Sequence, residues 1–173
     1  MPRLRAHGLS VTMPDGFEGR IFRRAPVAGS TTYAVVHVAT FPLPDEVADF
    51  GGGAVTLMGR DDVFVVLFEY GPESIGTALF ARQGIPRYLA PSDFSTTVLR
   101  RGVPGHAGTQ QFFTESGRPF TLYAVVGSSA RRAVTVPKVN SVLAGITVQP
   151  ASTREVARVT SAPTSLERWA AWN

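Results

Sequence analysis

Alternating apolar positions between residues 109 and 127 predict the element around which the chain is organised, a β-hairpin. Residues 115–118 supply the turn, in which Gly117 can take the positive φ that short hairpin loops need. One side of the second arm carries Phe120, Leu122, Ala124 and Val126, and the other carries Thr121, Tyr123 and Val125. Because both sides are largely apolar, we expect this arm to be an interior strand that is covered on two faces.

Further short apolar or alternating runs predict more strands, and two proline-led stretches predict helices. Strands are expected at residues 9–13, 17–23, 33–40, 54–58, 62–70, 94–101 and 146–148, with a short extended piece at 133–136. The first helix is expected to begin at Pro72 and stop at Gly84, and the second to begin at Pro137 and stop at Gly145. This order, with few helices among many strands, predicts an α+β fold with a mainly antiparallel sheet.

Three stretches carry a resemblance to a known family: SVTMPDGF near the start, QQFFTESGRPFTLY in the hairpin and VNSVLAGITV at the end. They resemble PsbP-like proteins, which implies a curved antiparallel sheet of about 7–9 strands flanked by two helices. The chain is also similar to small uncharacterised proteins of high-GC bacteria, through FPLP, DFGGG and EYG. PsbP-like proteins are, as a group, binding or assembly factors, so the resemblance implies that kind of role by analogy.

The final residues differ in character from the rest of the chain. We expect residues 1–148 to form one domain and residues 149–173 to form a polar linker with a short amphipathic segment. Thr164 and Glu167 have the spacing of a capping box, and Leu166, Trp169 and Trp172 follow at helical spacing. Such a short helix needs a surface to pack on, either within this chain or on a partner.

Composition narrows the classes of function. The 173 residues are 44% apolar and 17% charged, with a net charge of +4 and no cysteine. Disulfides and thiolate metal sites are therefore excluded, and a cytoplasmic location is expected. There is no apolar run long enough for a membrane span and no secretory signal pattern. The basic residues are not clustered as in nucleic-acid-binding arms, so nucleic acid is not an expected partner.

Motifs for catalysis are missing from the sequence. His7, His37 and His106 do not have metal-ligand spacing, and neither a nucleotide-binding glycine loop nor a serine-nucleophile elbow is present. We therefore predict no catalytic residue, no metal and no cofactor. The one arrangement that keeps an enzyme or small-ligand binder open is a pocket of His37 with Asp61 and Asp62 beside the loop at residues 41–53.

The favoured hypothesis is a non-enzymatic interaction or assembly protein that holds an acidic or apolar partner. Arginine pairs can bind carboxylates, and tryptophan is enriched at interfaces. The candidate partner-binding residues are Arg100, Arg101, Arg131, Arg132, Leu166, Trp169 and Trp172. Self-association through exposed sheet edges is a further possibility.

Overall fold

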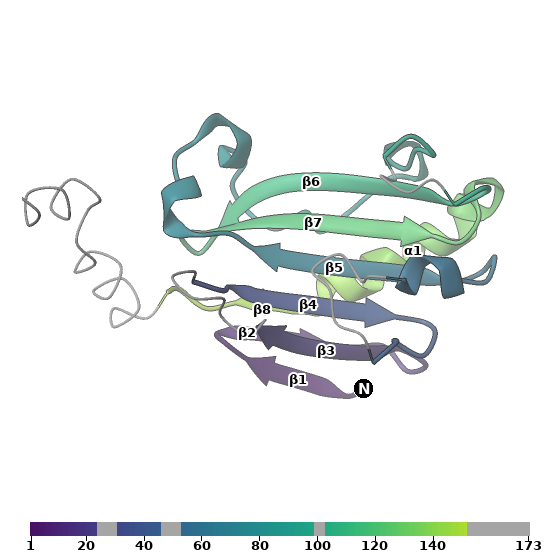
Figure 1. The fold of residues 1–173 in the computed structure, drawn as a ribbon, viewed down its shortest axis with the longest axis horizontal. Helices are drawn as coiled ribbons and strands as arrows, with labels where there is room; N and C mark the ends of the chain where they lie inside the picture. The colour runs from purple at the N-terminus through teal and green to yellow at the C-terminus, as the bar shows by residue number, and fades with distance from the viewer. Residues whose placement is uncertain (24–30, 46–52, 99–102, 152–173) are drawn as a thin grey trace, which may run out of the picture.

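The computed structural model describes residues 1–23, 31–45, 53–98 and 103–151, and within them it shows an α+β fold with eight strands and one α-helix. The strands are β1 (Arg3–Ala6), β2 (Leu9–Thr12), β3 (Glu18–Arg23), β4 (Ala34–Ala39), β5 (Val63–Glu69), β6 (Ala107–Glu115), β7 (Arg118–Val126) and β8 (Ile146–Val148). The helix is α1 (Arg132–Ala144). Two open antiparallel sheets result, with strand orders β1-β2-β8 and β3-β4-β5-β7-β6 (Figure 1).

The predicted hairpin is confirmed as β6 and β7, which pair from Ala107 with Val126 to Glu115 with Arg118. Its two-residue turn places Ser116 at φ 54° and Gly117 at φ 72°. Two successive residues with positive φ are typical of a type I′ turn, whose twist matches that of the strands. The predicted alternation also holds, because Leu122 and Ala124 face one core cluster while Val125 faces the other.

The five-stranded sheet is apolar on both faces because each face has its own cover. On one face, Val65 and Leu122 pack with Val139 of α1 and Val11 of β2. In Figure 1, α1 and β8 accordingly lie behind this sheet. The opposite face, turned towards the viewer, packs against side chains that flank its strands in sequence, including Phe41, Leu43 and Met58. The larger sheet is therefore the middle layer of the molecule.

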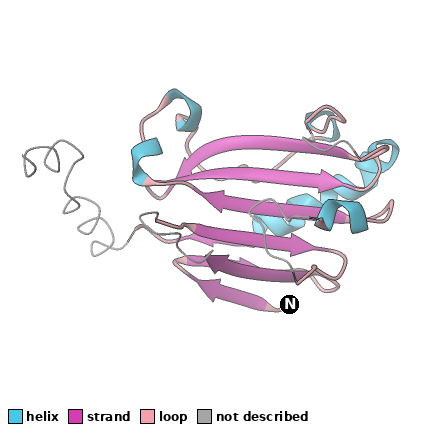
Figure 2. Cartoon of the chain, in the orientation of Figure 1, coloured by secondary structure: helices cyan, strands magenta, loops and turns pink. Residues whose placement is uncertain are grey.

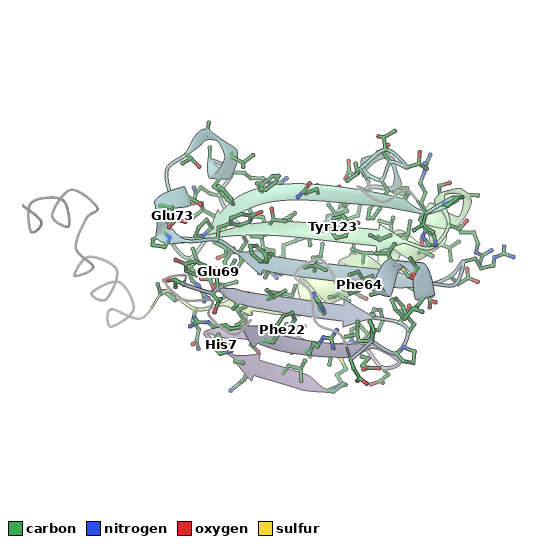
Figure 3. The ribbon with its side chains drawn as sticks, viewed as in Figure 1. His7, Phe22, Phe64, Glu69, Glu73 and Tyr123 are labelled. Atoms are coloured by element: carbon green, nitrogen blue, oxygen red, sulfur yellow. The ribbon has the colours of Figure 1, made fainter. Side chains whose placement is uncertain are left out.

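A buried ion pair fastens the smaller sheet to the larger one. Arg118 and Glu69 are 4% and 7% exposed, and two bonds of 2.7 and 2.8 Å join the guanidinium to both carboxylate oxygens. The remaining N–H groups of Arg118 donate to the carbonyls of His7 (3.1 Å), Gly8 (3.4 Å) and Gln149 (3.1 Å). All five guanidinium donors are thus used. Figure 3 shows Glu69 and His7 at the same end of the sheets.

Only one of the two expected α-helices is present in the described residues. The stretch after Pro72 forms two short 3-10 turns instead, η2 (Pro72–Ser74) and η3 (Ala78–Phe80). Gly76 lies between them at φ 79°, a conformation that a right-handed helix cannot include. Ile75 and Leu79 are 46% and 57% exposed, so these two apolar side chains do not pack on the core.

The second helix is present but begins earlier than predicted. It starts at Arg132, so Pro137 lies inside it and residues 133–136 are helical, not extended. Pro137 cannot donate to the carbonyl of Ala133. Ala133 is exposed, so water can reach that carbonyl and the interior proline is tolerated.

Besides the hairpin, the strand predictions were correct at residues 9–13, 17–23, 33–40, 62–70 and 146–148 to within about two residues. The stretch predicted at 54–58 is the 3-10 turn η1 (Ala54–Leu57). Part of the stretch at 94–101 lies outside the described residues, and within 94–98 only Ser95 forms an isolated bridge, with Gly108. β1 was not predicted. Figure 2 shows the short helical turns in loops beyond the strand ends.

The strands are also divided between two sheets instead of forming one curved sheet. No helix in the described part of the chain combines the length and apolar composition needed to cross a membrane.

Replacing one partner of the buried ion pair is expected to destabilise the fold strongly. Glu69→Leu would leave the Arg118 charge buried without a counter-ion, which costs about 3–5 kcal/mol of unfolding free energy. In the double variant Glu69→Leu with Arg118→Met, the unfolding free energy should fall by much less than the sum of the losses in the two single variants. Urea unfolding followed by circular dichroism measures both.

Glu18→Gln provides the control, because it neutralises an exposed carboxylate on β3 and should change stability by about 0.5 kcal/mol or less. A Glu69→Leu loss as small as that of the control would show that the ion pair does not hold the sheets together.

Candidate interaction surface

The structure places His37 in the packed face of the larger sheet. The side chain is 0% exposed, and its ring lies edge-on to Phe22 and Phe64 with centroid distances of 5.0 and 5.3 Å. Its Nδ1 lies 3.5 Å from the guanidinium of Arg20, which also donates to the carbonyl of Pro44 at 2.8 Å. Phe22 and Phe64 lie on the same face of the ribbon in Figure 3. Among the described residues, His37 is thus a packing element of this face.

Asp61 and Asp62 lie away from His37. The partner of His37 on β5 is Val66, four residues beyond Asp62, which is about 13 Å along the strand. Asp62 accepts bonds from the Thr40 hydroxyl at 2.8 Å and the Gly59 N–H at 2.7 Å, so it organises the turn before β5. These contacts do not assemble a pocket of His37 with the two carboxylates.

Arg131 and Arg132, the adjacent candidate arginines, have different roles. Arg131 forms an ion pair with Asp61 and so fastens the start of α1 to the turn before β5. Lys138 strengthens the same attachment by donating to the Asp61 carbonyl at 2.9 Å. Arg132 is exposed at the first position of α1. Arg100, Arg101, Leu166, Trp169 and Trp172 lie outside the described residues, and partner binding by them stays a prediction.

The outward side of α1 is the most unusual surface in the described part of the chain. The inward side, including Val136, Val139 and Leu143, is buried in the core. The outward side, however, is also almost free of charge. Its exposed residues after Arg132 are Ala133, Val134, Pro137, Ser141 and Ala144. We call these five residues the α1 stripe. Val134, near its N-terminal end, is 57% exposed.

Basic side chains border the α1 stripe. Arg132 and Lys138 lie on the helix itself, and α1 contains no aspartate or glutamate. Arg87 adds a third positive charge, because it donates to the carbonyls of Leu143 and Ile146 at 2.8 and 2.7 Å. The surface therefore combines an uncharged centre with a positive border.

Tyr88 extends this surface from a neighbouring loop. It is 74% exposed and precedes Leu89. The Leu89 N–H donates to the Asn140 side-chain oxygen at 2.9 Å, and the Asn140 side-chain NH₂ donates to the Leu89 carbonyl at 3.0 Å. This clamp holds the loop beside α1. Neither Tyr88 nor Val134 is among the residues predicted from the sequence. The lack of any acidic residue from 132 to 144 is a signal for this surface, but a helix that begins at Pro137 leaves out Ala133 and Val134.

Metal chemistry has no support in the described residues. They contain no group of three histidine or carboxylate side chains close enough to share an ion. The histidines are used separately, since His37 packs the sheet and His7 forms part of the β1–β2 turn at φ 52°.

Burial perturbs two titratable groups. It raises the pKa of Tyr123, which is on the same face of the larger sheet as Phe64. Burial also lowers the pKa of His106 below the ordinary value of 6.5, and a weaker effect from its hydrogen bond with the Met58 backbone acts in the opposite direction. His106 is 6% exposed, and its Nδ1 is buried without a partner among the described residues.

No family model matches the chain, and comparison with curated proteins and with solved structures found no significant match.

Acid is expected to destabilise the protein through His106. The folded state keeps this imidazole neutral, whereas the unfolded chain takes up a proton near pH 6.5, so stability is full above that pH and falls as the pH drops below it. His106→Gln removes the titrating group. Its free energy of unfolding, measured with urea between pH 7.5 and 5, should therefore fall less than that of the wild type.

The control is His7→Asn, which removes an exposed histidine and keeps a residue that tolerates positive φ. It should retain the part of the pH dependence that comes from His106. Identical pH profiles for wild type and His106→Gln would contradict the assignment.

Proposed function

We propose that this protein is a non-enzymatic interaction or assembly module, and that the α1 stripe holds an acidic, partly apolar segment of a partner protein. The observation that carries the proposal is the absence of charge from the outward side of α1 after Arg132, where Ala133, Val134 and Pro137 are exposed. A helix that is largely apolar on its outward as well as its inward side is typically covered on both. The described residues cover only the inward side, through Val136, Val139 and Leu143.

The charge around the stripe favours an acidic partner. Arg87, Arg132 and Lys138 border it, and α1 supplies no carboxylate to neutralise them. Bordering charges of one sign steer an oppositely charged partner and repel a like-charged one. A second copy of the chain docking face to face through α1 would bring these cations together, so this surface favours a different protein over self-association.

Tyr88 supports a protein partner in particular. Aromatic side chains held on a fixed backbone make effective anchors, because they bury a large area and lose little conformational entropy. The Asn140 clamp supplies such a backbone for Tyr88. We further propose that Trp169 and Trp172 contribute a second contact, as the sequence pattern predicts, and that the PsbP-like resemblance reflects a shared kind of role.

The proposal can be tested with peptides on the full chain. Amphipathic acidic peptides should bind and shift the backbone amide resonances of α1 and of the residues around Tyr88, and their affinity should fall as salt rises. Val134→Glu should weaken binding about tenfold, because it replaces an exposed apolar side chain of the stripe with a hydrated group that repels an acidic partner.

Leu57→Glu is the matched control, because Leu57 is 59% exposed, nearly the same as Val134 at 57%, and lies on η1 at the opposite side of the larger sheet. It should change affinity less than about twofold. Equal losses in the two variants, or resonance shifts confined to other elements, would refute the proposed surface. Trp169→Ala tests the tail separately and should also weaken binding.

A further inference from the structure

The outer face of the three-stranded sheet contains a polar depression that the proposed function does not use. Its volume is about 310 Å³, and it lies over the β1–β2 hairpin and the adjoining residues of β8. Its polar lining comes from Arg3, Arg5, His7, Ser10, Thr147 and Gln149. None of these residues belongs to the α1 stripe or its border.

Strand register brings the lining residues together. Arg5 pairs with Ser10, and Ser10 pairs with Thr147, so the three side chains form one row across the sheet and point to the same side. The neighbouring residues Leu9 and Val11 point into the core, which fixes the row on the outer side.

Arg3 lies two residues before Arg5 on β1, next to this row. Arg3 shares the outward side of β1 with Arg5, and its Nε donates to the Ser10 hydroxyl at 2.8 Å. That bond uses one of its five N–H donors and leaves the two terminal NH₂ groups for a ligand. Both arginines are exposed, and the lining contains no carboxylate to neutralise them.

Hydrogen bonds order the backbone at two lining residues of the depression, Gly8 and Gln149, before any ligand arrives. The carbonyls of Gly8 and Gln149 are both held by Arg118, and the Gln149 N–H donates to the Gly8 carbonyl at 2.8 Å. A site whose backbone is already ordered loses less entropy on binding than a mobile one.

We propose that this depression is a binding site for the phosphate group of a small, soluble phosphomonoester. The guanidinium groups of Arg3 and Arg5 would bind its oxygens as paired donors, and the Ser10 and Thr147 hydroxyls would donate to the remaining oxygens. This set of donors exceeds what the two oxygens of a carboxylate can accept. The volume is at the lower end of that found for small-molecule sites, which suits a compact ligand.

Nuclear magnetic resonance of the full chain provides the test. Titration with glycerol 3-phosphate, and separately with inorganic phosphate, should shift the amide resonances of β1, β2 and Thr147, and the two ligands should compete. Arg5→Gln should weaken binding about tenfold, because one charge-assisted pair of bonds is lost. The affinity of Arg5→Lys should lie between those of the wild type and Arg5→Gln, since lysine keeps the charge but lacks the paired donors of arginine.

Arg60→Gln is the matched control, because it removes the same charge from an exposed turn away from the depression. It should change affinity less than about twofold. Equal weakening by Arg5→Gln and Arg60→Gln would mean nonspecific attraction and would overturn the site. Binding to phosphatidic acid vesicles without binding to either soluble phosphate would also overturn it.

Discussion

The bond between Arg118 and Glu69 is the constraint on which the arrangement of the two sheets depends. It joins β5 and β7 of the larger sheet, and through the carbonyls of His7, Gly8 and Gln149 it reaches both hairpin and terminal strand of the smaller one. A buried ion pair is a weak source of net stability, because desolvation offsets most of the attraction. Any shift in strand register would leave these buried charges unpaired, so the pair disfavours other registers.

Several other polar groups, like this ion pair, stabilise the fold and do not form a site. The charged and polar groups that first suggested chemistry serve the fold: His37 packs a sheet face, Asp62 orders a turn and Arg131 anchors a helix. The surfaces left for recognition are the α1 stripe and the outer face of the smaller sheet. In Figure 1 α1 lies behind the larger sheet, and the smaller sheet packs on the same core cluster as α1 through Leu9 and Val11.

Sequence patterns predicted the elements that are stabilised by interactions between residues close together in the chain. The β6–β7 hairpin follows from alternation and from Gly117, because both act within a few residues. The helix expected after Pro72 does not form, although its start and stop signals are present. Gly76 has a positive φ, and the stretch lacks a surface on which a helix could pack. The Glu69–Arg118 pair could not be predicted, as it joins residues far apart in sequence. The α1 stripe was hidden because Pro137 can lie inside a helix when its orphaned carbonyl is solvated.

The order of strands in the smaller sheet has a consequence for biosynthesis. β2 lies between the first and the last strand of the described fold, β1 and β8. A nascent chain therefore cannot complete this sheet, or close the contacts that Arg118 makes at Gly8 and Gln149, until β8 has been translated and released. Closing such distant contacts makes folding slow relative to a helical protein of equal size. Until then the edge of β2 that pairs with β8 keeps its backbone N–H and carbonyl groups unpaired, a state in which sheet edges are prone to pair with other chains.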